Sequence, residues 1–280
     1  MKTEPHPGSR AVRPAGCAGR FYPADPAELR AQVTTHLAEA RIMPGRAPKA
    51  IIAPHAGYIY SGPVAGSAYA RLAEGAGVIR RVILVGPSHY DSFPGLAASS
   101  ADFFATPLGL VELDRAATAQ ALALPHVSVV DRAHRPEHSL EVQLPFLQAV
   151  LTRFTLVPFL VANGSGKEVC ELLASLWGGP ETCIVVSSDL SHYLPYDAAR
   201  AMDQATTEVI EALDADALQE DQACGCVPIR GLLRAARTHG LRCHTLDLRN
   251  SGDTAGSRDR VVGYGAYAFV PNGEACVGGA

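Results

Sequence analysis

Three histidines in this chain each come at the end of a short apolar run that is typical of a buried strand. Strands of a parallel α/β sheet end along one common edge, where ligands and catalytic groups gather. Three imidazoles brought to that edge from distant positions therefore predict a built site. The histidines and the residues before them are His55 after 50–54, His89 after 82–88 and His192 after 184–191.

Two cysteines add a second kind of metal ligand to this pattern. Cys224 and Cys226 form a Cys-x-Cys pair just before an apolar segment that is predicted to be a helix. A thiolate at a helix N-terminus has a lowered pKa and is a good metal ligand or nucleophile. Together with the imidazoles, the pair favours a metal site of mixed nitrogen and sulfur ligands, and a pair of buried thiols is the alternative.

Carboxylates lie close to the same candidate site. Asp189 precedes His192 by three residues, so it can accept a hydrogen bond from a ligand imidazole, or His192 can act as a general base. The alternative is a helix-capping aspartate and a packed histidine. His138 and Glu141, at the start of an amphipathic stretch over 137–150, are further candidates for the site.

The elements that must position these residues alternate between strands and helices, which predicts one α/β domain. We expect a central mixed, largely parallel β-sheet flanked by helices, with antiparallel pairing near the C-terminus. A helix over 197–213 is expected to bury Ala201, Ala205, Val209 and Leu213. The strands are expected at 50–54, 81–86, 95–99, 109–112, 155–161, 183–187, 241–248 and 261–270.

Composition narrows the class of protein. The chain has 280 residues, of which 48% are hydrophobic, and a net charge of −4, so we expect a globular protein without a nucleic-acid or membrane partner. No apolar run reaches the roughly 18 to 20 residues of a membrane span, and the polar N-terminus is no secretory signal. The odd number of cysteines favours a reducing cytoplasm. We expect a flexible tail over 1–13, the domain over 14–272 and a C-terminal tail over 273–280.

Six motifs, in order along nearly the whole chain, resemble the Memo family, whose bacterial and archaeal members are labelled AmmeMemoRadiSam system protein B. They are Gly-Arg-Phe-Tyr-Pro at 19–23, Pro-His-Ala-Gly-Tyr at 54–58, Gly-Pro-Ser-His at 86–89, Glu-His-Ser-Leu-Glu-Val-Gln at 137–143, Ser-Ser-Asp-Leu-Ser-His-Tyr at 187–193 and Cys-Gly-Cys-Val-Pro-Ile at 224–229.

This resemblance implies a fold like that of the class III extradiol (LigB-type) dioxygenases. Carried over by motif, His55, His89 and Cys224 are the implied metal ligands, and Asp189 and His192 lie in the same pocket. The resemblance leaves the role of Cys226 open. It implies iron(II) or copper, with zinc also compatible, a small-molecule or peptide ligand at the strand edge, and a functional link to AMMECR-like and radical SAM proteins.

The leading hypothesis is a cytoplasmic, metal-dependent oxidoreductase with a dioxygenase-like site in which His192 moves protons. Extradiol dioxygenases use two histidines and a carboxylate, and a thiolate in third place changes the redox range, so ring cleavage is not implied. The first alternative is a binding protein that holds a peptide or small anion without turnover. The second is a hydrolase with Cys224 as nucleophile, His192 as base and Asp189 as the group that orients it.

Overall fold

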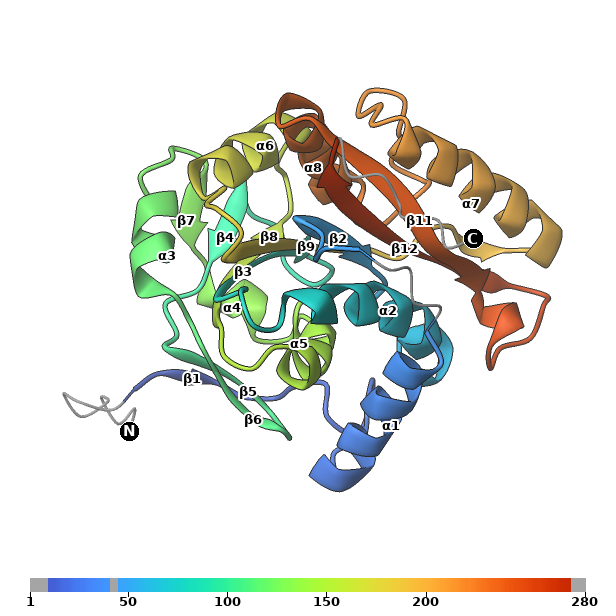
Figure 1. Cartoon of the computed structure of the whole chain (residues 1–280), viewed down its shortest axis with the longest axis horizontal. Coiled ribbons are helices and arrows are strands. Elements are labelled where there is room, and N and C mark those ends of the chain that lie inside the picture. The colour runs from blue at the N-terminus through green and yellow to red at the C-terminus, as the bar shows by residue number, and fades with distance from the viewer. Residues whose placement is uncertain (1–9, 41–44, 273–280) are drawn as a thin grey trace.

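The centre of the molecule is a set of four parallel strands, rich in Val, Ile and Leu, in a computed structural model that describes residues 10–40 and 45–272 (Figure 1). Parallel strands covered on both faces are expected to be this apolar. In spatial order they are β2 (Ala50–Ala53), β9 (Thr182–Ser187), β3 (Arg81–Pro87) and β8 (Thr155–Val161).

Antiparallel strands extend this sheet on both sides, so the sheet is mixed, and parallel pairing dominates only at its centre. On one side β12 (Val261–Pro271) pairs with β2, while β11 (Leu241–Asn250) and β10 (His192–Leu194) pair with β12. On the other side β4 (Leu96–Ala98) pairs antiparallel with β8, and β7 (Val127–Val129) pairs parallel with β4. The antiparallel pairing expected near the C-terminus is confirmed by β11 and β12.

A second, three-stranded sheet lies beside the first and includes the start of the described chain. It contains β1 (Val12–Arg13), β5 (Phe103–Thr106) and β6 (Gly109–Glu112) in that order. Val12 and Arg13, which fall within the predicted N-terminal tail, are thus strand residues. Residues 1–9 of that tail, and the C-terminal tail predicted over 273–280, lie outside the described residues.

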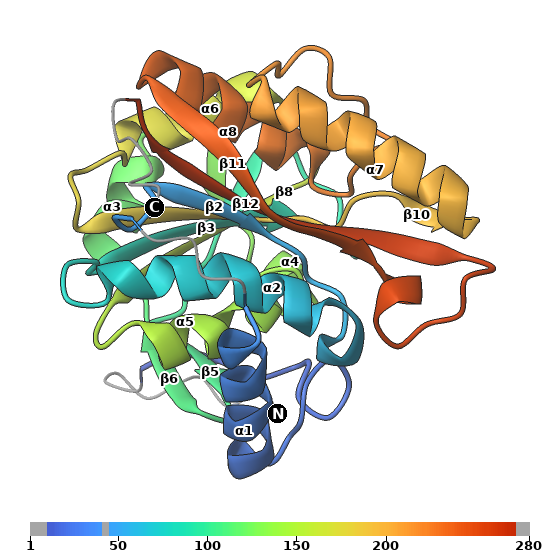
Figure 2. The same ribbon diagram turned by 45° about the vertical axis from the view of Figure 1, so that its right-hand side comes forward.

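Helices cover both faces of the main sheet (Figure 2). Successive residues of β2 point to opposite faces, so that Ile51 joins one apolar core with α1, α2 and α5, and Ile52 joins another with α3, α6 and α8. Across residues 10–40 and 45–272, no helix combines the length and apolar character needed to cross a membrane. The helices are α1 (Pro26–Ala38), α2 (Tyr58–Leu72), α3 (Arg115–Ala121), α4 (Asp131–His134), α5 (Leu144–Val150), α6 (Gly166–Ser175), α7 (Tyr196–Glu211) and α8 (Cys226–Thr238), with 3₁₀ turns at Ala73–Gly75, Glu141–Gln143 and Ser251–Asp253.

The pattern over 137–150 is helical with an interruption at Pro145, and the structure has shorter pieces here, with the break before Pro145 rather than at it. A 3₁₀ turn at Glu141–Gln143 leads into α5, which carries Pro145 in its first turn. Proline is accommodated there because the first turn of a helix has no intrahelical partner for its N–H groups. Residues 137–140, which precede the turn, are outside any helix, so their conformation is determined by contacts at the candidate site.

Helix α7 forms as expected but buries a different face. Ala201 and Ala205 are exposed, whereas the buried residues include Asp203 and Thr207. A carboxylate oxygen of Asp203 accepts the backbone N–H of Ser191 at 3.0 Å, and the Thr207 hydroxyl pairs with the Tyr267 hydroxyl at 2.7 Å. Polar residues can occupy this face because each has a hydrogen-bond partner in the fold.

Candidate metal centre

His55 lies directly after β2 and is fixed by a hydrogen-bond network that determines its tautomer. The side chain is 1% exposed, and its Nδ1 lies 2.8 Å from Ser187 Oγ. The single hydroxyl proton of Ser187 is donated to the carbonyl oxygen of Ser139, and Gln143 donates its amide N–H to the same Oγ. Nδ1 must therefore be the donor, which leaves an unprotonated lone pair on Nε2.

His89 follows β3 and is oriented by a buried carboxylate. Its Nδ1 lies 2.9 Å from Oε1 of Glu137, and its backbone N–H donates to Oε2 of the same residue at 2.6 Å. The backbone N–H groups of His138 and Ser139 also donate to Glu137. A carboxylate on one imidazole nitrogen leaves the other nitrogen available, as is usual for metal-binding histidines.

His138 is the third imidazole of the cluster. Ligand atoms of His55, His89 and His138 all lie within 4.8 Å of one another. The ring of His138 stacks on His89, with centroids 4.6 Å apart, and on Phe21, with centroids 4.5 Å apart. Its segment approaches β3 so closely that a Cβ on Gly86 would meet a Leu140 side-chain carbon at 2.9 Å, so the site requires glycine there.

Cys224 reaches the cluster from the turn before α8. Its Sγ lies 3.2 Å from Nε2 of His55 and accepts the backbone N–H of Asp189 at 3.3 Å. The close approach depends on Gly225, where a Cβ would lie only 2.6 Å from that of Ser188. Cys226 instead packs into the apolar core at the start of α8. The two thiols of the Cys-x-Cys pair therefore have different environments.

The two predicted catalytic residues lie in different surroundings. Asp189 is buried, and its Oδ1 accepts the backbone N–H of His55 at 2.7 Å. His192 is exposed at the start of β10, and its Nδ1 pairs with the carbonyl oxygen of Leu190 at 2.8 Å. His192 therefore lies at the surface, because pairing of β10 with β12 places it at the edge of the sheet, and its role beside a metal stays a prediction.

Burial keeps the imidazoles of His55 and His138 neutral. It lowers the pKa of His55 to about 3, with the charge of His89 adding to the effect, and lowers the pKa of His138 to about 4, with His55 adding. Burial also raises the pKa of the Cys224 thiol to about 12, and the charge of Asp189 acts in the same direction. At neutral pH the structure thus presents unprotonated imidazoles beside a protonated thiol.

Glu137 is a buried charged group beside the cluster. Burial alone acts to raise its pKa, but hydrogen bonds from the His89 ring and from backbone N–H groups outweigh it and bring the pKa to about 2. The carboxylate is therefore ionised at neutral pH. Its negative charge, held beside one nitrogen of the imidazole, favours binding of a cation at the opposite nitrogen.

The donor set fits a transition metal. Imidazole nitrogen suits zinc, copper and iron, and a thiolate adds preference for softer ions. Nδ1 of His138 makes no well-directed hydrogen bond among the described residues, but it lies 3.3 Å from Oε1 of Glu137, the carboxylate that also contacts His89. Neutral imidazoles, fixed tautomers and a shared buried carboxylate together mark this cluster as a place where a metal can bind.

We expect that Glu137→Gln weakens metal binding by about 10- to 100-fold, the usual effect of removing a carboxylate partner from a ligand histidine. The amide is uncharged and no longer places a negative charge beside Nδ1 of His89. Competition with a chromophoric chelator measures the affinity. Glu112→Gln, an exposed change on β6, is the matched control. Equal affinity of both variants and the parent protein would show that Glu137 has no part in binding.

Sequence reasoning placed His55 and His89 together and gave His138 only as a further candidate. The adjacent Glu137 was the available signal, since an ionised group beside a histidine is typical of a metal ligand's partner. Glu141, the other further candidate, lies outside the cluster and pairs with Arg13. Ser187 was read only as part of a strand, because its role depends on three partners that are distant in the sequence.

Comparison with known proteins gives consistent results. The family model described as Memo-like protein matches residues 13–268. A MEMO1 family protein of Aquifex aeolicus is 35% identical over 274 residues, covering 92% of this chain and 99% of the relative. MEMO1 family proteins of Ignicoccus hospitalis and Methanopyrus kandleri are each 36% identical, and each alignment covers 92% of this chain and 98% of the relative.

Proposed function

Because this chain belongs to the Memo family, and because its histidine cluster can hold a metal, we propose that it is a metal-dependent oxidoreductase. One observation carries the proposal: the Sγ of Cys224 lies 3.2 Å from Nε2 of His55, beside three imidazoles whose ligand atoms lie within 4.8 Å of one another. Sulfur and nitrogen donors together suit copper, iron and zinc, of which copper and iron are redox-active.

We propose iron(II) or copper as the metal, held by His55, His89 and Cys224, with His138 as an adjacent fourth donor. Zinc also binds such ligands but has no redox chemistry of its own. The backbone N–H of Asp189 supports the assignment of Cys224, because an N–H group aimed at sulfur stabilises a thiolate. Such a metal supplies electron transfer and open positions for exogenous ligands.

The residues around the cluster have separable roles in this proposal. Ser187 holds the proton of His55 on Nδ1, and Glu137 holds that of His89 on Nδ1, so both rings present Nε2. The carboxylate of Asp189 holds the backbone of His55 in place by accepting the His55 N–H. His192, exposed at the rim, is proposed to exchange protons with a bound substrate. Tyr90, whose ring lies 5.8 Å from His138, is proposed to contact a small-molecule or peptide ligand.

A second candidate function rests on the same Cys224–His55 contact. A thiol and an imidazole at 3.2 Å could form the nucleophile and base of a hydrolase, with His55 in the place predicted for His192. Burial opposes this reading, because it raises the pKa of Cys224 to about 12 and lowers that of His55 to about 3. A nucleophilic thiolate would be scarce in such a pair.

Anaerobic loading with iron(II) or copper(I), followed by exposure to air, tests the oxidoreductase proposal. The parent protein is expected to consume oxygen at least about 10-fold faster than Cys224→Ser protein that carries the same metal. The substitution exchanges a soft thiolate ligand for a hard, protonated hydroxyl. The copper(II) form of the parent protein should show a sulfur-to-metal charge-transfer absorption. That absorption should be lost in Cys224→Ser.

Other results of this experiment would support the two alternative functions, ligand binding without turnover and hydrolysis. Equal oxygen uptake by the two proteins, or none by either in the presence of phenolic and hydroxy-acid compounds, would favour a protein that binds a ligand without turnover. Ester or amide hydrolysis that survives chelation and disappears in Cys224→Ser would favour the hydrolase. Cys226→Ser is the matched control, since that thiol is buried in the apolar core.

A further inference from the structure

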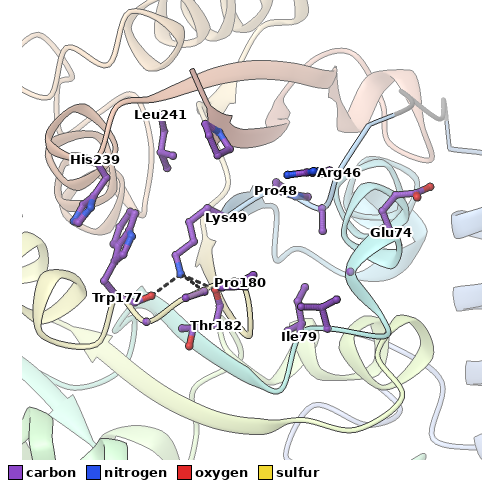
Figure 3. A pocket seen from close by; sticks show the side chains of 16 residues that line it. Arg46, Pro48, Lys49, Glu74, Ile79, Trp177, Pro180, Thr182, His239 and Leu241 are labelled. Carbon is purple, nitrogen blue, oxygen red and sulfur yellow. Dashed lines mark hydrogen bonds between the residues drawn. The ribbon is translucent and has the colours of Figure 1, made fainter. Parts of the chain in front are cut away.

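A cavity of about 570 Å³ lies at the end of the sheet opposite the histidine cluster (Figure 3). Its lining includes Lys49, which immediately precedes β2, and Thr182, the first residue of β9. His55 and Asp189 follow the other ends of the same two strands. The cavity is therefore separate from the candidate metal centre, and its size is typical of sites for small organic molecules.

One wall of the cavity is aromatic and firmly held. The indole ring of Trp177 stacks on the imidazole of His239 with centroids 3.7 Å apart and an interplanar angle of 7°. The ammonium group of Lys49 lies 5.2 Å from the indole centroid and donates hydrogen bonds to the carbonyl oxygens of Trp177, Gly179 and Thr182 at 2.5, 2.9 and 2.8 Å. The loop that carries Trp177 is thus tied to the start of β2.

The polar groups of this wall indicate what the cavity can recognise. Lys49 directs all three of its N–H groups to carbonyl oxygens, so it offers no donor to a carboxylate or phosphate. Glu74 and Arg46 bring opposite charges to the lining, which disfavours a ligand with a strong net charge. Within the described part of the chain, the indole N–H of Trp177 and the ring nitrogens of His239 have no hydrogen-bond partner.

We propose that this cavity binds a small, uncharged, flat aromatic molecule that carries a hydrogen-bond acceptor. Apolar side chains of Pro48, Ile79, Pro180 and Leu241 provide flat surfaces, and burial of an aromatic ring against them is favourable. The indole N–H supplies a donor for the acceptor. Because the cavity contains no residue of the histidine cluster, this proposal does not depend on the metal or on the oxidoreductase activity.

The single tryptophan of the chain lies in the lining of this cavity and serves as the fluorescence donor of the test. N-phenyl-1-naphthylamine, an uncharged fluorescent aromatic amine, is titrated into the full-length protein while Trp177 is excited. Energy transfer from Trp177 to the dye is expected on binding. Val78→Phe, which adds bulk at a lining position that is 52% exposed, is expected to weaken binding at least about 10-fold, a loss equivalent to about 1.4 kcal/mol.

Two controls determine the outcome. Leu110→Phe makes a matched change at a residue that is 57% exposed on β6, outside the cavity, and should leave dye binding unchanged. His239→Ala removes the stacking partner of Trp177 and should weaken binding by about 2- to 10-fold. Absence of energy transfer, or equal binding by Val78→Phe and Leu110→Phe, would overturn the site. Tighter binding of the sulfonated analogue 8-anilino-1-naphthalenesulfonate would overturn the assignment of an uncharged ligand.

Discussion

Replacement of His89 by alanine is expected to weaken the binding of a divalent metal by about 100-fold or more. This loss exceeds the one usually caused by removing a residue that only hydrogen-bonds to a metal ligand. The reason is that His89 belongs to the three-imidazole group and is also a ligand in the proposed set with His55 and Cys224. The fold should survive, because the side chain is 28% exposed and Glu137 keeps its backbone N–H donors. Chelator competition measures the affinity, with His239→Ala as the imidazole control. Unchanged affinity in His89→Ala would remove the metal site.

The same assay separates the two possible third ligands. We expect Cys224→Ser to weaken metal binding more than His138→Ala, because the sulfur already accepts the N–H of Asp189 and lies against His55. The opposite order would assign the third position to His138, whose ligand atom lies within 4.8 Å of those of His55 and His89. Either result is consistent with a metal-binding protein. The redox role proposed for the thiolate requires that Cys224→Ser weaken metal binding more than His138→Ala does.

The parts of this site that could be predicted are those determined by local sequence. His55 and His89 each end an apolar strand, and parallel strands end at one edge, so their meeting follows from the pattern. His138 could not be ranked in the same way. It lies on an irregular segment whose position depends on close packing against Gly86, and neither feature produces a periodic signal.

The errors have a common physical cause. Helix α7 was expected to bury alanines, because hydrophobic periodicity cannot show that Asp203 and Thr207 have hydrogen-bond partners elsewhere in the fold. His192 was expected beside the metal rather than at the surface. The pairing of β10 with β12 that places it at the edge of the sheet joins segments about 70 residues apart, so the local sequence does not show it. Partners distant in the sequence decide both cases. The chain's central strands, by contrast, depend mainly on their own apolar composition.

Glu141→Ala is expected to lower the free energy of unfolding by about 3 to 5 kcal/mol, the usual effect of breaking a buried ion pair. The carboxylate is fully buried and pairs with the guanidinium of Arg13. It also accepts hydrogen bonds from the backbone N–H groups of Gly16 and Cys17 and from the hydroxyl of Tyr22. Its removal leaves a buried positive charge and two buried donors, the Cys17 N–H and the Tyr22 hydroxyl, without their partner.

Urea unfolding measures this loss, and a double-mutant cycle with Arg13→Met isolates the ion pair. The two changes should be non-additive by about 1 to 3 kcal/mol, because each removes the same interaction. Lys167→Ala is the control: it breaks a surface pair with Glu171 at 4.0 Å, so a loss of less than about 1 kcal/mol is expected. Additive effects of the Arg13 and Glu141 changes would show that their contact does not stabilise the fold.

The same network connects the start of the described chain to the metal centre, so the loss should extend to metal binding. Arg13 donates to the carbonyl oxygens of His134 and Glu137, at 2.6 and 2.7 Å, while Glu141 holds the segment that leads to Phe21. Phe21 stacks on His138, and Glu137 orients His89. Glu141→Ala protein that is still folded should therefore bind metal more weakly, whereas Lys167→Ala protein should bind it as the parent does. Normal affinity in folded Glu141→Ala protein would mean that the histidine cluster is held in place without Glu141.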